Sequence, residues 1–496
     1  MGKGARTREA NAPKLREKKE KQQKEAARRR RKSWIIRGCT AVVALILVGA
    51  LVFTGVQKIS LDNGTKMRQT VVAESANYSI DGAMFSYFIH YYYQNYLNSY
   101  GSYLSLIGLD TNKSLKDQVY SESDGTTWFD MFAESAETMA QQYLVLNEAA
   151  KAAGMTLTDK EKEIVDSKAA AFDTTGYGRG VTNEDMQHIF DLSVVASKFY
   201  QSKLAEFEPT QEEIETAYNE DPKAYQYVDY YSYTLSFADE DDTSSSSSTS
   251  SEPETIKLTK DEAKELADEL AACKDNQAFI DWVVNYTKET STEEPSQEDQ
   301  DKIPDSLLTS SASYTADDDV SEWAFSAKVN DTYIYENDDA NTYTVYSLKS
   351  EAARREDNTV NVRHILVSTK EEAQSILDTY LAGDKTEESF GLLAFEYSTD
   401  NGSVDYGGLY ENVYQGQMVD AFNDWCFDES RQVGDCDIVE TDYGYHVMLF
   451  CGEGLVRWQS EVRGDLVNDK YTAYYDELKT TYPVTFYSDR YDVIEA

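Results

Sequence analysis

The sequence predicts an α+β protein that is anchored to a membrane by one helix. Three observations support this fold class. An uncharged apolar run of 19 residues, 38–56, follows a basic N-terminal tail. Apolar residues recur with helical spacing through most of residues 78–219. Two later stretches, 225–350 and 356–453, begin and end with the polar and apolar alternation of β-strands.

The charge of the chain changes sign along its length. Residues 1–37 carry 15 Lys and Arg against 4 Asp and Glu, a net of +11, so the remainder carries −53 of a total of −42. As a helix, residues 38–56 would span about 28 Å, roughly the hydrocarbon thickness of a bilayer. Because the flanking positive charge precedes this run, we expect a cytoplasmic N-terminus and an extracytoplasmic location for everything after it.

Two alternatives concern this N-terminal region. A cleaved signal peptide would explain the apolar run, but no small-x-small cleavage site follows it. Cys39, at the start of the run, is not placed as a lipoprotein acceptor. The basic tail could bind nucleic acid, but a topology signal on anionic lipid headgroups explains the same charges. We therefore expect an uncleaved anchor and no nucleic-acid partner.

The next region, residues 57–224, is predicted to be mostly helical. A short strand and turn at 78–82 precede a long helix, and further helices are expected over 128–153, 158–171, 183–207 and 210–219. Aromatic and apolar residues follow one side of the long helix: Phe85, Phe88, Ile89, Tyr92, Tyr96, Tyr100 and Tyr103. Such a stripe usually forms core, and the alternative is that part of it lines a cradle for unfolded chains.

Strand-like runs at both ends of residues 358–452 contain two of the four histidines, His364 and His446. The second run is predicted to fold as a tight hairpin about Tyr443-Gly444. Cys436 and Cys451 are equidistant from that centre. They could be bonded across the two strands or remain free thiols, and the sequence leaves both open.

Five fragments across these 95 residues resemble the parvulin-type peptidyl-prolyl isomerases. In chain order the fragments are Arg363-His364-Ile365-Leu366-Val367; Phe390-Gly391-Leu392-Leu393-Ala394 with Tyr397-Ser398-Thr399-Asp400; Gly407-Gly408-Leu409; Gly416-Gln417-Met418 with Phe422; and Thr441-Asp442-Tyr443-Gly444-Tyr445-His446. The chain departs from the family at Tyr410, where a glycine is usual, and lacks the usual acidic residue after the two glycines. The departure affects the rim of the expected pocket.

The resemblance implies a proline pocket formed by Leu409, Met418 and Phe422. Thr441 and Tyr443 would border the same site. The spacing of Met418 and Phe422 is also that of ordinary helix core, and this alternative stays open.

The resemblance also implies three catalytic residues. His364 and His446 would form a hydrogen-bonded pair beneath the pocket, and Asp400 would lie near the reacting carbonyl; a solvated turn is the alternative for Asp400. Because isomerisation breaks no covalent bond, neither a metal nor a cofactor is expected.

Residues 225–350 read as a second, degenerate copy of the parvulin-like domain. The strand at 227–235 parallels the strand with His364, and Tyr343-Thr344-Val345 parallels Tyr445-His446-Val447. In this alignment Tyr233, Glu289 and Thr344 replace His364, Asp400 and His446. This copy is expected to bind or to act as a spacer, and not to catalyse. Within it, the acidic and Ser-rich residues 239–256 predict a disordered loop.

Residues 455–496 are predicted to form a helix and a strand. By resemblance to extracytoplasmic foldases of PrsA and SurA type, this piece packs back on the N-terminal helices. The predicted domains are a basic cytoplasmic tail (1–37), a transmembrane helix (38–56), a discontinuous helical chaperone core (57–224 and 455–496), a degenerate parvulin-like domain (225–350) and a parvulin domain (356–453).

The implied function is that of a bacterial, membrane-anchored foldase that isomerises X–Pro bonds in secreted proteins and holds unfolded clients. The alternative is a tethered chaperone whose parvulin-like domains bind clients without catalysis. A surface or cell-wall structural protein has only the acidic exterior in its favour. The sequence does not distinguish a monomer from a dimer.

Overall fold

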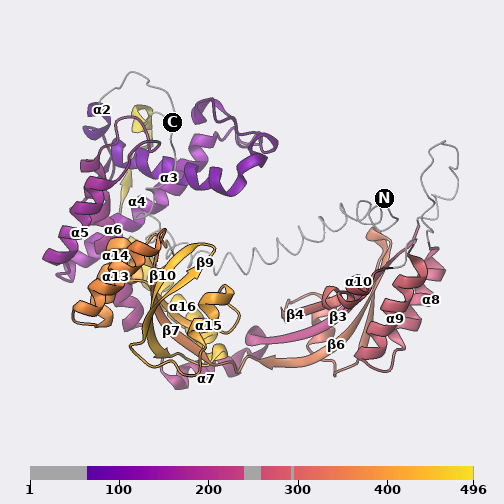
Figure 1. The fold of residues 1–496 in the computed structure, drawn as a ribbon. Helices are drawn as coiled ribbons and strands as arrows, with labels where there is room; N and C mark the ends of the chain where they lie inside the picture. Colours follow the sequence, from indigo (N-terminus) through magenta and orange to yellow (C-terminus); the bar gives the residue numbers. More distant parts are fainter. Residues whose placement is uncertain (1–63, 239–257, 292–294, 401, 495–496) are drawn as a thin grey trace. The chain divides into compact units, whose positions relative to one another are not determined.

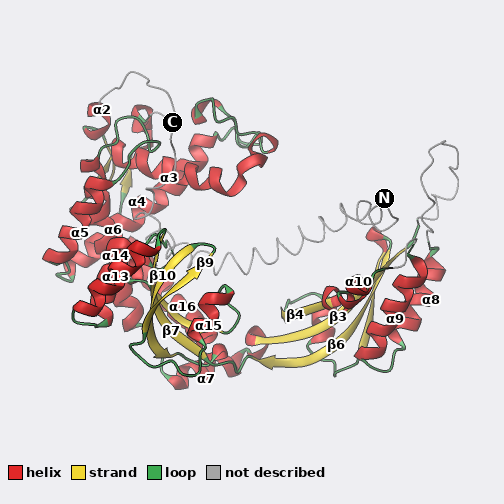
Figure 2. Cartoon of the chain, in the orientation of Figure 1, coloured by secondary structure: helices red, strands yellow, loops and turns green. Residues whose placement is uncertain are grey.

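The structure, a computed structural model, describes residues 64–238, 258–291, 295–400 and 402–494 (Figure 1). The predicted tail, membrane helix and loop 239–256 lie outside these residues. Within the described part, no helix is both long enough and apolar enough to cross a membrane. The chain divides into two units, whose described parts are residues 211–356 and residues 64–210 with 357–494. Both combine helices and strands, as Figure 2 shows, so the mixed α and β composition is confirmed.

Four N-terminal helices begin and end close to their predicted limits: α3 (Gly82–Tyr100), α4 (Trp128–Ala152), α5 (Asp159–Ala171) and α6 (Asn183–Glu206). A short helix that was not predicted, α2 (Thr65–Arg68), precedes them. Asp81 caps α3, and Thr127, Thr158 and Thr182 form capping boxes with the third residues of α4, α5 and α6. Each cap satisfies backbone N–H groups that a helix start would otherwise leave unpaired.

The aromatic stripe of α3 is core in its first half only. Phe85, Phe88 and Ile89 are fully buried, whereas Tyr100 is 45% and Tyr103 64% exposed. Helix α3 ends at Tyr100, and Gly101 passes the chain into a short 3₁₀ helix that contains Tyr103. The helical period therefore stops before the last residue of the predicted stripe.

The C-terminal segment completes the N-terminal core, as predicted. Helix α16 (Arg457–Thr481) leads to β11 (Thr485–Phe486), which pairs with β1 (Val71–Glu74); β2 (Ser79–Asp81) lies on the other side of β1. Tyr491 stacks on Phe85 of α3 with ring centroids 4.8 Å apart. The two ends of the described chain thus share one hydrophobic core.

A four-stranded antiparallel sheet carries both histidines of the parvulin-like motif. Its strands are β7 (Thr359–Val367), β8 (Leu409–Tyr414), β9 (Cys436–Thr441) and β10 (Gly444–Glu453), in the order β8-β7-β10-β9. Helices α13 (Lys370–Ala382) and α14 (Glu387–Tyr397) cover one face, where they bury Ile365. Because side chains alternate along a strand, His364 lies on the other face, which α15 (Asp420–Cys426) covers.

The hairpin is confirmed, with its turn one position earlier than predicted. Thr441 pairs with Gly444, so Asp442 and Tyr443 form a two-residue turn. Gly444 has φ of 132°, and a Cβ there would lie 2.5 Å from the carbonyl oxygen of Val367. In this register Cys436 faces Leu449. The pairing with Cys451 was therefore misplaced, and both thiols are free.

The other unit has a sheet of the same strand order, β4-β3-β6-β5. It begins with α7 (Gln211–Glu220), and its strands are β3 (Gln226–Ser236), β4 (Leu308–Ser313), β5 (Thr332–Asn337) and β6 (Thr342–Arg354). Helices α8 (Lys260–Ala271) and α9 (Asn276–Thr290) pack on one face of this sheet (Figure 1). Three short helices, α10 (Gln297–Asp301), α11 (Ile303–Leu307) and α12 (Asp319–Ala324), complete the unit.

The alignment of the two sheets needs a correction of one residue. Tyr233 pairs with Val345 on the face covered by α8 and α9, as Ile365 pairs with Val447 beneath α13 and α14. Tyr233 therefore corresponds to Ile365, and Ser232 takes the place of His364. A slip of one residue moves every side chain of a strand to the opposite face.

The other two correspondences have different outcomes. Thr344 pairs with Thr234 as His446 pairs with Leu366, so Thr344 does stand where His446 does. Glu289 lies inside α9 and is exposed, whereas Asp400 follows the end of α14. Ser232 and Thr344 therefore occupy the two histidine positions, so this sheet has no histidine pair there, in either alignment.

Candidate active site

The two central strands bring His364 and His446 together. Leu366 pairs with His446 and His364 with Met448, so the two histidines are diagonal neighbours on one face of the sheet. Both are buried, with 2% and 6% of their surface exposed. Their Nδ1 atoms lie 3.0 Å apart, and their rings stack with centroids 5.2 Å apart. The hydrogen-bonded pair that the resemblance implied is present.

The outer nitrogen of His364 contacts two oxygen-bearing side chains. Asp400 Oδ2 lies 2.9 Å and Ser403 Oγ 3.0 Å from Nε2. Ser403 and Tyr410 each donate a hydrogen bond to Asp400 Oδ2, the latter over 2.9 Å. The Tyr410 ring also stacks on His364 with centroids 4.9 Å apart. Asp400 is therefore bound to the histidine, and its carboxylate forms part of the buried chain of contacts.

The outer nitrogen of His446 contacts the hairpin. Thr441 Oγ1 lies 2.9 Å from Nε2, and the backbone N–H of Tyr443 donates to Thr441 Oγ1 over 3.1 Å. Thr441 thus touches the histidine pair directly. The Tyr443 side chain is 72% exposed at the turn and contributes to this chain only through its backbone.

With a neutral His446, two arrangements of protons satisfy all these contacts. In one, His364 carries two N–H groups and donates to Asp400 and to His446, which in turn donates to Thr441. In the other, Thr441 donates to His446, His446 to His364, and His364 to Asp400. In both, Ser403 donates to Asp400 and His446 is neutral. The arrangements differ by one proton, so the chain of contacts survives a change of charge on His364.

The electrostatics of the site agree with a neutral His446. Burial, helped by the charge of His364, lowers the pKa of His446 to about 4, although Asp400 opposes the shift. Burial raises the pKa of the Asp400 carboxyl, but the hydrogen bond and charge of His364, with bonds from Ser403 and Tyr410, hold this pKa below its usual range. Burial and the adjacent Asp400 raise the pKa of Tyr410. Near neutral pH, Asp400 is therefore a carboxylate.

The predicted pocket residues differ in where they lie. Phe422 is buried, and its ring meets both imidazoles edge to face with centroids 5.5 Å away. Met418 is half-buried in the same cluster. Leu409 pairs with Arg363 on β7, which puts it on the opposite face from His364, whereas Tyr410 pairs with Val362 on the histidine face. The structure thus places Tyr410, not Leu409, against the histidines.

Sequence reasoning missed two members of the site, Ser403 and Tyr410. Tyr410 had a signal, because it replaces the glycine usual in the family. Ser403 had none, since its contact depends on the fold of the loop after α14. Among the described residues, no group of three or more His, Cys, Asp or Glu is placed to hold a metal ion.

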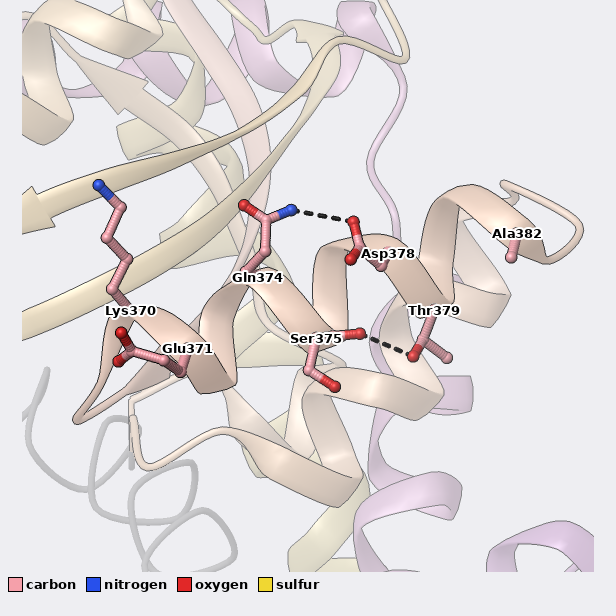
Figure 3. A pocket seen from close by; sticks show the side chains of 7 residues that line it. All are labelled: Lys370, Glu371, Gln374, Ser375, Asp378, Thr379 and Ala382. Atoms are coloured by element: carbon pink, nitrogen blue, oxygen red, sulfur yellow. Dashed lines mark hydrogen bonds between the residues drawn. The ribbon is translucent and has the colours of Figure 1, made fainter.

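A cavity of about 760 Å³ lies away from these residues, along one side of α13. The lining residues are Lys370, Glu371, Gln374, Ser375, Asp378, Thr379 and Ala382, shown in Figure 3. Gln374 bonds Asp378, and the hydroxyl of Thr379 donates to the backbone oxygen of Ser375, so these polar groups bind within their own helix. None of the candidate site residues lines this cavity.

Comparison with known proteins supports the resemblance. Residues 346–450 match the family described as PPIC-type PPIASE domain. The foldase protein PrsA of Caldanaerobacter subterraneus subsp. tengcongensis is 36% identical over 129 residues, which cover 24% of this chain and 40% of that protein. The putative peptidyl-prolyl cis-trans isomerase Cbf2 of Campylobacter jejuni is 37% identical over 92 residues, covering 18% of this chain and 34% of Cbf2.

Solved structures also match part of the chain. NmPin, the parvuline of Nitrosopumilus maritimus, has 35% sequence identity and covers 19% of this chain and 97% of its own, with a TM-score of 0.17. PrsA from Bacillus cereus has 24% identity and covers 25% of this chain and 48% of its own, with a TM-score of 0.19.

The chain spans only about a third to two fifths of the length of the curated relatives given above. The matched segment nevertheless includes His364, Asp400 and His446. Residues 346–450 are therefore similar to the parvulin-type, or PPIC-type, peptidyl-prolyl isomerases, and part of the chain is similar to the PrsA foldases.

Proposed function

We propose that the chain is a peptidyl-prolyl cis/trans isomerase and chaperone that assists the folding of secreted proteins outside the membrane. The observation that carries this proposal is the buried chain from Asp400 through His364 and His446 to Thr441. It lies within the segment that matches the isomerase family.

The chemistry that such a site must perform is rotation about one bond. The planar X–Pro imide resists rotation with a barrier of roughly 18–20 kcal/mol because its C–N bond is partly double. Twisting makes the carbonyl group less polar, so a site poor in water favours the twisted form. Each 1.4 kcal/mol of this preference gives about a tenfold increase in rate.

The residues of the site fit these requirements. Phe422 and the two imidazoles offer a buried surface against which a proline ring can pack. Asp400 and Thr441 hold the outer nitrogens of the pair, so the rings keep one orientation while a client rotates. The catalytic roles of His364, Asp400 and His446, and the binding roles of Met418, Phe422, Thr441 and Tyr443, are part of the proposal.

The domain division is also part of the proposal. We assign residues 225–350 to a parvulin-like domain that binds or spaces clients, because its sheet has the strand order of the isomerase sheet. Residues 38–56 would anchor the chain in the membrane with the N-terminus in the cytoplasm. The uncharged apolar sequence and the basic tail support this location, and a dimer is compatible with it.

An isomerase assay on a short X–Pro peptide tests the function. The wild-type chain in detergent should accelerate cis/trans exchange, and a variant with both Asp400→Ala and His446→Ala should lose at least about 100-fold in kcat/KM, or roughly 3 kcal/mol. Circular dichroism checks that the variant stays folded. Equal rates for the two proteins would contradict the isomerase. If both still suppress aggregation of an unfolded client, the non-catalytic chaperone is favoured.

A further inference from the structure

The loop that carries Asp400 belongs to two cores at once. Asp400 and Ser403 contact His364 Nε2 in the candidate active site. The next residue, Val404, begins a 3₁₀ turn, η7 (Val404–Tyr406), and is fully buried. Its neighbours belong to the core of the N-terminal helices, and Tyr406 packs at the edge of that core. The active-site loop is thus inserted into the helical core.

Helices α5 and α6 hold this loop and the adjoining helix. Gln201 of α6 donates a hydrogen bond from Nε2 to the backbone oxygen of Asp405. The Nζ atom of Lys168 in α5 lies 5.1 Å from the ring centre of Phe395 in α14. Phe395 is itself buried. Both contacts join a helix of the N-terminal core to the isomerase segment, far from the proline pocket.

The docked end of the loop is connected rigidly to the catalytic end. Within it, the N–H of Val404 donates to Asp400 O over 3.1 Å and the N–H of Gly408 to Ser403 O over 2.8 Å. Gly408 O accepts from the N–H of His364 over 2.8 Å. A Cβ on Gly408 would lie 2.2 Å from the carbonyl oxygen of His364, so the loop is pressed against β7. Movement of Val404 would therefore displace Asp400 and Ser403 relative to the histidine.

Two ionisable groups at the docked end, Lys168 and Asp405, are partly buried. Burial raises the pKa of Asp405 to about 8, with Lys168 opposing the shift. Burial lowers the pKa of Lys168 to about 8, opposed by Asp405 and Glu396. Lys168 is the cation that acts on Asp405, so replacing Lys168 changes the electrostatics at the residue whose backbone oxygen Gln201 binds.

We propose that Gln201 and Lys168 are positioning residues for the isomerase: by holding the loop at Asp405 and helix α14 at Phe395, the helical core sets the contacts of Asp400 and Ser403 with His364. This inference rests on the proposed isomerase function. It implies that the helical core controls the catalytic rate in addition to holding clients.

The test uses the full chain with Gln201→Ala and Lys168→Met. We expect kcat on an X–Pro peptide to fall about five- to twentyfold while KM changes less than twofold, because the pocket itself is untouched. Matched controls are Gln187→Ala in α6, whose side chain bonds Asp166, and Lys162→Met in α5, which pairs with Asp166 and Asp191. Lys168→Arg should retain most of the wild-type kcat.

A second readout does not depend on activity. The chain has only four histidines, so isotope labelling of histidine gives four resolvable imidazole signals by nuclear magnetic resonance. The His364 and His446 signals should move in both test variants and stay in place in both controls, while His90 of α3 serves as an internal reference. Unchanged signals and unchanged kcat would overturn the inference, as would equal changes in the controls. An inactive wild-type chain whose His364 signal still responds would refute the isomerase function and leave the coupling intact.

Discussion

The two four-stranded sheets have the same strand order and differ in the side chains at the two positions of the histidine pair. Next to α15, one sheet buries the pair His364 and His446. At the corresponding positions the other has Ser232 and Thr344, and the Thr344 hydroxyl bonds that of Thr234 over 2.9 Å. The second sheet thus keeps the same strand order without a histidine pair. The comparison separates what the sheet needs in order to form from what the histidine pair adds to one of its faces.

The largest effect is expected when the isomerase sheet is given the residue that the other sheet has at the position of His364. His364→Ser should lower kcat/KM on an X–Pro peptide by roughly 100-fold, or about 3 kcal/mol, because Asp400, Ser403 and His446 all lose their common partner. The isomerase assay measures this loss, and Ser232→Ala in the other sheet is the control. A variant that kept more than a tenth of the wild-type activity would refute the central role of His364.

A smaller effect is expected at the aromatic wall. Phe422→Leu keeps an apolar side chain but removes the edge-to-face contacts with both imidazoles, which are worth about 0.5–1.5 kcal/mol each. We expect kcat/KM to fall about five- to tenfold. The matched control is Phe390→Leu: Phe390 of α14 is fully buried and packs on the opposite face of the same sheet. If the two variants lose activity equally, the loss reflects packing and not the site.

The pH dependence of stability should separate the two sheets. Because burial lowers the pKa of folded His446 to about 4, protonation favours the unfolded chain. The stabilisation is complete above the usual histidine pKa of about 6.5 and is lost as the pH falls toward 4. Calorimetry should show the transition of the isomerase unit moving down in this window, by roughly 2–4 °C for each kcal/mol lost.

His446→Gln tests the assignment of that shift. It should remove most of the fall in Tm between pH 6.5 and 4, and leave the transition of residues 211–356 unchanged. Asp400, whose pKa is held low, contributes stability that is lost only below the usual carboxyl range. An identical pH profile in wild type and variant would assign the shift to another group.

The smallest effect is expected at Tyr410. Tyr410→Phe keeps the ring on His364 and removes one hydrogen bond to Asp400, so kcat/KM should fall about two- to threefold, or roughly 0.5 kcal/mol. Tyr445→Phe, which removes a bond to the exposed Glu440, should have no effect. A loss of tenfold or more at Tyr410 would mean that its hydroxyl contacts the client directly.

The sequence predicted the elements well because their signals are local. Thr158 with Glu161 marks the start of α5, and the turn before Gly444 marks the hairpin. The histidine pair was predicted through the family motifs. Asp400 was expected at the site, but its hydrogen bond with His364 was not.

The errors share one cause. Tyr233 was assigned to the histidine face, but the residue on that face is its neighbour Ser232. Leu409 was assigned to the pocket, but its neighbour Tyr410 lies on the histidine face. The face of a strand residue depends on pairing with partners far away in the chain, which no short motif contains. Ser403 was missed for the same reason, since its contact with His364 follows from the docking of Val404.

The pairing of β1 with β11 determines when this molecule can finish folding. Glu74, which pairs with Thr485, also accepts a hydrogen bond from the hydroxyl of Tyr487, 413 positions away in the sequence. Closing so long a loop carries a large entropy cost and is slow. A chain that folds as it is synthesised would complete its isomerase sheet, whose strands lie between residues 359 and 453, before the final strand is made. The protein would then possess its catalytic fold while the rest of it is still a nascent polypeptide.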